Sequence, residues 1–151
     1  MKYVIVTPAF NEEKNITMTI KSVLSQTIKP IIWIIVDDGS TDNTAEVIKH
    51  YADNYPWIRY VYREKKNDQS YFASNVYAIQ KGVENLSDID YDYLAILDAD
   101  ITLYDAYYED IAYAFENDQL LGIASGNCAD RINEQLVKHL YDRRSCAKAV
   151  M

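Results

Sequence analysis

The sequence predicts an α/β fold in which a mostly parallel sheet carries helices on both faces. Short segments rich in β-branched residues alternate with segments whose apolar residues recur at helical spacing. Strands that alternate with helices in this way form parallel sheets. In addition, residues 31–36 and 93–97 are apolar throughout, as expected for strands that are buried on both faces.

The strands are predicted from apolar runs of strand length. Such runs are rich in Val, Ile, Leu and aromatic residues, most of which favour strands. They occur at residues 3–7, 31–36, 57–62, 93–97 and 120–125. We expect the first four to be strands of one sheet, and Leu120 to Ser125 is a candidate fifth strand.

The helices are predicted from apolar residues spaced three, four or seven positions apart. Pro30 closes the first strand–helix unit, and Ser40 or Thr41 is placed to cap the second helix. The apolar positions that indicate the five helices are Ile16, Ile20, Val23 and Leu24; Ala45, Ile48 and Ala52; Phe72, Val76, Ile79 and Val83; Tyr107, Ile111, Ala114 and Phe115; and Leu136, Val137, Leu140 and Tyr141.

Composition and charge limit the class of protein. The 151 residues are 49% hydrophobic and 25% charged, which is typical of one globular domain. The net charge of -8 argues against a nucleic-acid partner, because such proteins carry a basic face. No apolar run reaches the roughly 18 residues of a membrane span, and no signal-peptide pattern is present. We therefore expect a cytoplasmic protein, with the cytoplasmic face of a membrane as a compatible location.

Three of the expected strands run into polar segments, at residues 7–13, 37–42 and 98–100. In open parallel sheets, ligands bind beyond the carboxyl ends of the strands, where the strand order reverses. With the strand order 3-2-1-4, the three polar segments lie side by side around one crevice. Acidic groups gathered there repel one another unless a cation or a hydrogen-bond donor offsets the repulsion.

Asp98 and Asp100 are two positions apart after a buried strand, so their side chains point the same way if the segment is extended. Such a pair can hold Mg²⁺ or Mn²⁺ through one or two oxygens and leave other positions for phosphate oxygens. A solvated turn would show the same pattern. The sequence therefore indicates a metal site at this strand end without excluding a simple turn.

Asp37 and Asp38 precede Gly39 and a helix, a pattern that is also common in turns with helix-capping acids. An ionised carboxylate only accepts hydrogen bonds. One of these two groups would therefore favour a base that presents a ring N–H, namely uracil, thymine or guanine. Adenine and cytosine carry a bare acceptor nitrogen at the equivalent place.

The segments TPAFNEE, DDGSTD and LDAD, in this order and each at a strand end, resemble the family 2 glycosyltransferases of the GT-A fold. The resemblance covers roughly residues 1–130. It implies an inverting enzyme that transfers a sugar from a UDP-, dTDP- or GDP-sugar to an acceptor hydroxyl, with Mn²⁺ or Mg²⁺ as cofactor. It also implies a place in cell-envelope or polysaccharide biosynthesis.

The resemblance assigns roles to individual residues. It places Asp38 at the base, Asp98 near the ribose and the metal, and Asp100 as a ligand of the metal. Residues 72–75 resemble the A-x-N stretch of the family, which faces the nucleotide. The nucleotide-binding residues implied in this way are Pro8, Ala9, Phe10, Glu12, Asp38, Ala73 and Asp98.

The chain departs from the family pattern before the A-x-N stretch. The family often has a Gly-rich segment and a basic residue there, but residues 67–72 contain neither Gly nor Arg. Lys65 or Lys66 is the candidate replacement for the missing contact with the diphosphate.

A second departure concerns the general base, which in the family is an Asp or Glu some tens of residues after the D-x-D. No matching residue follows Asp100, although Asp130 and Asp142 are available acids. We expect the base to lie beyond Met151. Residues 1–151 are then a single GT-A-like nucleotide-sugar-binding domain that stops before the acceptor-binding half.

Three alternatives remain at this point. The chain is compatible with a non-catalytic module that binds a nucleotide sugar. Residues 98–103 also resemble the first motif of haloacid-dehalogenase-type phosphatases, but that motif normally opens the fold, and here three strand–helix units precede it. Nucleotidyltransferases share the sheet type, yet they usually open with a Gly-rich, basic phosphate loop, which residues 7–13 do not provide.

Overall fold

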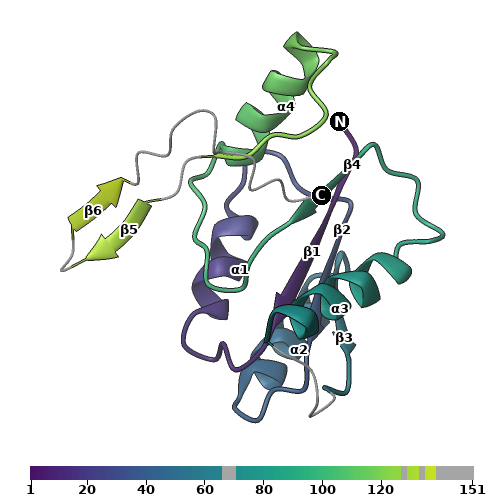
Figure 1. Cartoon of the computed structure of the whole chain (residues 1–151), viewed down its shortest axis with the longest axis vertical. Coiled ribbons are helices and arrows are strands. Elements are labelled where there is room, and N and C mark those ends of the chain that lie inside the picture. The colour runs from purple at the N-terminus through teal and green to yellow at the C-terminus, as the bar shows by residue number, and fades with distance from the viewer. Residues whose placement is uncertain (66–70, 127–128, 133–134, 139–151) are drawn as a thin grey trace.

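A computed structural model describes residues 1–65, 71–126, 129–132 and 135–138 and confirms the α/β fold (Figure 1). Strands and helices alternate along most of the chain, as the apolar patterns predict. The elements are β1 (Tyr3–Ala9), α1 (Ile16–Leu24), β2 (Ile32–Asp37), α2 (Thr44–Asn54), β3 (Ile58–Tyr62), α3 (Tyr71–Glu84), β4 (Tyr93–Ile96), α4 (Tyr107–Asn117), β5 (Ala129–Ile132) and β6 (Gln135–Lys138).

The main sheet is parallel and has the strand order β3-β2-β1-β4, which confirms the predicted order. β1 is central and pairs with β2 on one side and β4 on the other. The chain begins at the centre of the sheet with β1, continues outward through β2 and β3, and then crosses to the other side of β1 to form β4. The strand order therefore reverses beside β1, and a crevice opens at the carboxyl ends of β1, β2 and β4.

Alternate residues of each strand face two separate apolar layers. One layer packs the odd-numbered residues of β1 and β2, such as Ile5 and Trp33, against α1, α2 and α4. The other packs even-numbered residues, such as Val6 and Ile34, against α3. All seven residues of β1 and all six of β2 are buried, and apart from Thr7 and Asp37 they are apolar, as expected for strands that are covered on both faces.

β1 extends two residues beyond the predicted end, because Pro8 and Ala9 continue the pairing with β2. The pairing of β1 with β4 ends at Val6. Pro8, which has no N–H to donate, therefore lies where β1 is paired on one side only, as proline in a strand requires. The early end of β4 leaves residues 98–100 at the mouth of the crevice.

Two predicted elements are wrong. Leu120 to Ser125 is not a strand: it begins in a turn and continues as irregular backbone beside α4, with Leu120 fully exposed. The helix predicted around Leu136 and Val137 is also wrong, because residues 135–138 form β6, which pairs antiparallel with β5. Both errors have one cause: a short apolar run fits several structures, and packing or pairing with another segment decides among them.

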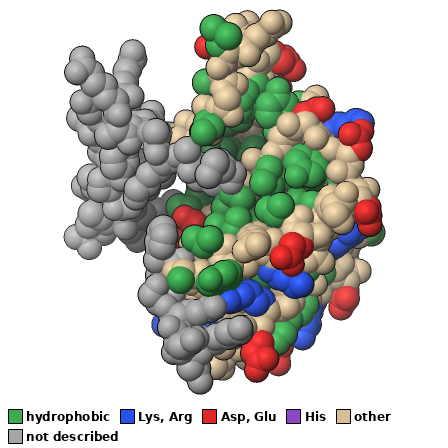
Figure 2. Space-filling model, turned by 45° about the vertical axis from the view of Figure 1, so that its right-hand side comes forward, with side chains coloured by type: hydrophobic (Ala, Val, Ile, Leu, Met, Phe, Trp, Pro, Cys, Tyr) green, Lys and Arg blue, Asp and Glu red, His purple; other side chains and the backbone are tan. Residues whose placement is uncertain are grey.

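An apolar hollow of about 280 Å³ lies between β4, α4 and residues 122–125. Hydrophobic side chains gather below α4 in Figure 2.

Across the described part of the chain, no helix combines the length and apolar character needed to span a membrane. The expectation of a cytoplasmic location stays a prediction.

Candidate functional site

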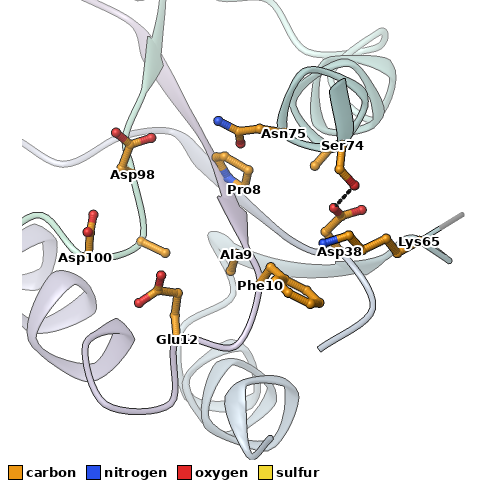
Figure 3. A pocket seen from close by; sticks show the side chains of 12 residues that line it. Pro8, Ala9, Phe10, Glu12, Asp38, Lys65, Ser74, Asn75, Asp98 and Asp100 are labelled. Carbon is orange, nitrogen blue, oxygen red and sulfur yellow. Dashed lines mark hydrogen bonds between the residues drawn. The ribbon is translucent and has the colours of Figure 1, made fainter. Parts of the chain in front are cut away.

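The carboxyl ends of β1, β2 and β4 meet at one cavity of about 240 Å³ (Figure 3). The predicted convergence of the three polar segments is therefore observed, and residues of α3 close the remaining side. The lining residues are Pro8, Ala9, Phe10, Glu12, Asp38, Lys65, Ser74, Asn75, Ala78, Asp98, Ala99 and Asp100. Seven of the eight residues that the sequence predicts for the site are among them, and Ala73 is not.

The loop after β1 is shaped by Asn11, which has a positive φ of 56°. Asparagine tolerates this left-handed conformation better than most residues. Its backbone N–H donates to the Ser40 hydroxyl at 3.0 Å, and its side-chain oxygen accepts from the Thr41 N–H at 2.8 Å. Asn11 thereby fixes the loop after β1 to the loop after β2, and both loops carry lining residues.

A second set of contacts joins the same two loops one step further from the sheet. The N–H of Glu12 donates to the Thr44 hydroxyl at 2.7 Å, and that of Glu13 donates to Asp42 at 3.1 Å. Asp42 also accepts from the Thr44 N–H at 3.0 Å, at the start of α2. The prediction that Ser40 or Thr41 caps this helix is therefore wrong, because Asp42 supplies the acceptor.

The turn at residues 98–100 is anchored from two directions. The Leu97 N–H donates to the Val6 carbonyl at 3.0 Å, and the Thr19 hydroxyl donates to the Ala99 carbonyl at 2.7 Å. Ala99 is buried, whereas Asp98 and Asp100 are exposed. The two carboxylates therefore lie on the open side of the turn, at the edge of the cavity.

Glu12 lies near Asp100 in the same part of the cavity (Figure 3). Its carboxylate accepts from the Asn15 side-chain amide at 2.8 Å. Among the described residues, no group of three or more His, Cys, Asp or Glu side chains is arranged to hold a metal ion. A cation at residues 98–100 would therefore need further ligands from a bound molecule or from water.

Asp37 and Asp38 are both buried but do different things. Asp37 accepts from the Ser40 N–H at 2.8 Å and from the Tyr60 hydroxyl at 2.9 Å, so it stabilises the turn after β2. Partial burial and the adjacent Asp37 carboxylate raise the pKa of Tyr60 well above its usual value. Asp38 is the one that lines the cavity. Of the two acids, the structure places only Asp38 where a ligand can meet it.

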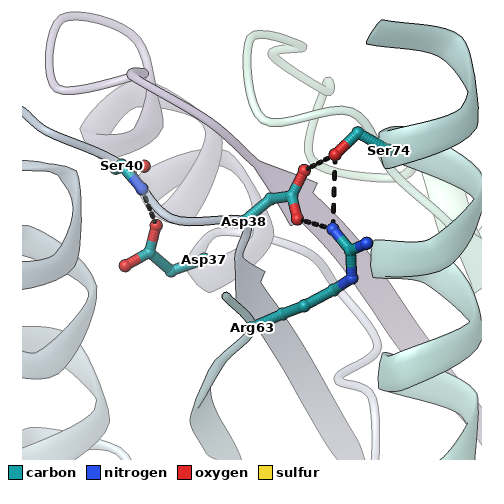
Figure 4. Close-up of polar contacts among 5 residues, drawn as sticks. All are labelled: Asp37, Asp38, Ser40, Arg63 and Ser74. Carbon is teal, nitrogen blue, oxygen red and sulfur yellow. Dashed lines mark hydrogen bonds and ion pairs between the residues drawn. The ribbon is translucent and has the colours of Figure 1, made fainter. Parts of the chain in front are cut away.

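The Asp38 carboxylate forms an ion pair with Arg63 and accepts a hydrogen bond from the Ser74 hydroxyl (Figure 4). Sequence reasoning missed Arg63. It follows β3 directly, so the rule that functional residues lie just after each strand applies to it as well. Extending that rule from the acidic strand ends to the end of β3 would have identified Arg63.

Lys65 extends over the aromatic ring of Phe10, with its Nζ atom 3.3 Å from the ring centroid. Both side chains line the cavity, so Lys65 places a positive charge beside it. Gly39 makes this packing possible, because a Cβ atom there would lie 3.1 Å from the Lys65 Cβ. The other candidate, Lys66, lies outside the described residues.

The A-x-N stretch lies in the first part of α3, where Ser74 and Asn75 line the cavity. Ala73 lies on the same helix but is not among the lining residues. Of the two available acids considered as a general base, Asp130 lies in β5, but its side chain and all of Asp142 are outside the described residues. The position of the base therefore stays a prediction.

Comparison with known proteins identifies the family. The sequence profile described as Glycosyl transferase family 2 matches residues 4–145. The uncharacterised glycosyltransferase YibD of Escherichia coli (strain K12) is 31% identical over 118 residues, which are 78% of this chain and 31% of that protein. The poly-β-1,6-N-acetyl-D-glucosamine synthase of Staphylococcus aureus (strain COL) is 34% identical over 119 residues, which are 78% of this chain and 26% of that protein.

Two solved structures share the fold. One is the mannosyltransferase PcManGT from Pyrobaculum calidifontis in complex with GDP-Man and Mn²⁺, with a TM-score of 0.65 and 19% identity over 82% of this chain and 34% of that one. The other is residues 1–349 of TarS from Staphylococcus aureus in complex with UDP, with a TM-score of 0.62 and 20% identity over 79% of this chain and 33% of that one.

The chain spans between about a quarter and a third of the length of these proteins. The family match favours the glycosyltransferase interpretation over the phosphatase and nucleotidyltransferase ones. Because the family profile covers nearly the whole sequence, and because its motifs line one cavity at the strand ends, the chain belongs to glycosyl transferase family 2.

Proposed function

We propose that this chain binds the nucleotide-diphosphate sugar of an inverting, metal-dependent glycosyltransferase that acts on an acceptor hydroxyl. The observation that carries the proposal is the arrangement of acids in one cavity. Asp38 lies at one side, Asp98 and Asp100 lie at the other, and Pro8, Ala9 and Phe10 lie between them (Figure 3). A nucleotide diphosphate has the same order of groups, with a base at one end and phosphates at the other.

The side of the cavity with Asp38 suits the base. Pro8 and Phe10 supply apolar surface against which a flat ring can pack. Asp38 supplies an acceptor, and an ionised carboxylate favours a ring N–H over a bare ring nitrogen. We therefore assign the donor to the UDP-, dTDP- or GDP-sugars. Among proteins of the same fold, TarS has been solved with UDP and PcManGT with GDP-Man.

The side with Asp98 and Asp100 suits the diphosphate and a divalent cation. Mg²⁺ and Mn²⁺ prefer oxygen ligands, and Mg²⁺ is commonly held by one or two carboxylates together with substrate phosphates and water. Two exposed carboxylates at the cavity edge fit that pattern, and PcManGT binds Mn²⁺ together with GDP-Man. When bound, such an ion neutralises charge that develops on the departing diphosphate.

Each of these residues then has a separate role in holding the donor. Asp38 orients the base, Asp98 and Asp100 fix the phosphate end, and Lys65 adds a positive charge beside Phe10. This holds the anomeric carbon in one position, which favours attack by an acceptor hydroxyl from the opposite face and inversion in a single displacement. A carboxylate base removes the proton of that hydroxyl as it attacks, and we place this base outside the cavity residues named here.

Base discrimination tests the proposal. Titration calorimetry with UDP, GDP, CDP and ADP in Mn²⁺ should show tighter binding of UDP or GDP than of CDP and ADP. A hydrogen bond to a charged group contributes about 1.5–3 kcal/mol, which corresponds to a preference of about tenfold or more. Asp38→Asn should reduce it. Equal binding of all four nucleotides would contradict the proposed role of Asp38.

A further inference from the structure

Both oxygens of the Asp38 carboxylate already have a partner within the protein. Oδ1 accepts from the Arg63 guanidinium and Oδ2 accepts from the Ser74 hydroxyl (Figure 4). Ser74 in turn accepts from Nη1 of Arg63 at 3.2 Å. Three side chains, from the residue after β2, the residue after β3 and α3, therefore form one closed network.

The network is buried, and Arg63 lies behind Asp38 rather than in the cavity. The side chains of Arg63 and Asp38 are 12% and 5% exposed. Asp38 and Ser74 line the cavity, whereas Arg63 is not among the lining residues. The Arg63 N–H extends the β2–β3 pairing by donating to the Asp37 carbonyl at 2.9 Å, and its guanidinium lies 5.4 Å from the Tyr77 ring centroid. A ligand can therefore meet Asp38 while Arg63 stays in place.

The partners of Asp38 leave it able to accept one more hydrogen bond. Each carboxylate oxygen has two lone pairs, and the known contacts use one on each oxygen. The guanidinium keeps its charge at any physiological pH and forms a strong, directional contact with the carboxylate. Arg63 and Ser74 thus orient the carboxylate that accepts from a ring N–H.

We propose that Arg63, assisted by Ser74, is a positioning residue that determines base selectivity, because it holds the Asp38 carboxylate in one orientation at the cavity. The inference rests on the proposed function, in which Asp38 meets the base. It adds the cause of the selectivity: the preference for a ring N–H depends on a guanidinium that does not itself touch the nucleotide. Removing the guanidinium should therefore reduce the difference in affinity between bases more than it reduces the affinity for nucleotide diphosphates as a class.

The test compares UDP with CDP, which differ in the hydrogen-bonding edge of the ring, by titration calorimetry in Mn²⁺. The variants are Arg63→Gln, Arg63→Lys and, as a control, Arg59→Gln, which removes an exposed arginine from β3, the strand that Arg63 follows. Thermal melting checks that each variant is folded. If the wild-type chain prefers GDP to UDP, the same comparison is made with GDP and ADP.

Arg63→Gln should reduce the preference for UDP over CDP several-fold, mainly by weakening UDP. Arg63→Lys should keep part of the preference, and Arg59→Gln should keep all of it. If Arg63→Gln does not fold, Ser74→Ala is the deciding variant, because it keeps the charge of Arg63 and removes one oriented donor to Asp38. A reduced preference of Ser74→Ala for UDP over CDP supports the inference. An unchanged preference overturns it. A folded Arg63→Gln variant that retains the wild-type preference overturns the inference and leaves the proposed function intact. A wild-type chain that binds no nucleotide diphosphate overturns both.

Discussion

The hydroxyl of Thr19 donates a 2.7 Å hydrogen bond to the carbonyl oxygen of Ala99, the residue between Asp98 and Asp100. Thr19 is completely buried on α1, so this bond joins the helix to the turn that carries the two acids. The direction of both carboxylates depends on the backbone of that turn. Thr19 therefore acts on the proposed cation site without touching it.

Thr19→Val should weaken nucleotide binding only where a cation contributes. Valine has a similar shape but leaves the Ala99 carbonyl without this donor, and a buried unsatisfied polar group costs about 1–3 kcal/mol. We expect the affinity for UDP to fall several-fold in Mn²⁺ and to stay unchanged in EDTA, with Thr19→Ser close to wild type. An equal loss in both solutions would show that Thr19 only stabilises the fold.

Lys65→Met should weaken binding of the diphosphate group without weakening binding of the nucleoside. The change removes the charged Nζ that lies over the Phe10 ring and leaves an apolar side chain of similar length. Because a charged hydrogen bond contributes about 1.5–3 kcal/mol, the affinity for UDP should fall by about tenfold or more, while uridine binds as before. Lys81→Met, in the last turn of α3, is the control. Equal weakening of UDP and uridine would show that Lys65 contacts the nucleoside instead.

Gly82→Ala should destabilise the fold. A Cβ atom at this position of α3 would lie 2.4 Å from Cγ1 of Val6 in β1, so the helix and the central strand would have to separate. Overpacking of this kind costs about 1–3 kcal/mol, against a gain in helix propensity of about 1 kcal/mol. Urea denaturation measures the difference. Gly122→Ala, where a Cβ meets nothing within 4 Å, should stay close to wild type.

Asp42 should make stability depend on pH. Its partial burial raises the pKa, but hydrogen bonds from the Thr44 hydroxyl and N–H and from the Glu13 N–H outweigh this and hold the pKa below its usual value. A carboxyl whose pKa is lower in the folded state stabilises the fold above its unfolded pKa of about 3.9, and this contribution is lost as the pH falls through the folded pKa.

The free energy of unfolding should therefore be lower for Asp42→Asn than for wild type at pH 6, and this difference should shrink by pH 3. Asparagine keeps one acceptor oxygen but removes the charge, and a negative charge near a helix N-terminus contributes about 0.3–1 kcal/mol. Urea denaturation at the two pH values measures the difference. A difference that is equally large at both pH values would mean that the charge of Asp42 contributes nothing.

Much of the sheet could be predicted from the sequence, because strands buried on both faces must be apolar throughout. The run at 31–36 shows this most clearly: Ile31 is exposed, but residues 32–36 lie in β2, between β1 and β3 and under two layers of helices. The polar segments after three strands predicted the convergence of Asp38, Asp98 and Asp100 for a related reason: parallel strands all end at the same edge.

Two kinds of feature could not be predicted in this way. Residues 135–138 pair with β5, and residues 120–126 pack beside α4 with the Gly126 N–H donating to the Tyr107 hydroxyl at 3.1 Å. Both depend on contacts with another segment, in the first case a strand only two residues away in the chain, and local periodicity does not encode such contacts. The same holds for the ion pair of Asp38 with Arg63, whose residues are far apart in the chain and adjacent only because β2 and β3 are neighbours.

The central claim is that this cavity holds a nucleotide diphosphate through a cation on Asp98 and Asp100. The most direct test is calorimetric titration of UDP in Mn²⁺ and in EDTA, with wild type, Asp100→Asn and Asp88→Asn. Asp88 is an exposed acid outside the cavity, so its substitution removes the same charge elsewhere. We predict several-fold tighter binding in Mn²⁺ for wild type and Asp88→Asn, and loss of that increase in Asp100→Asn. Equal affinity of the wild-type chain in Mn²⁺ and EDTA would contradict the account.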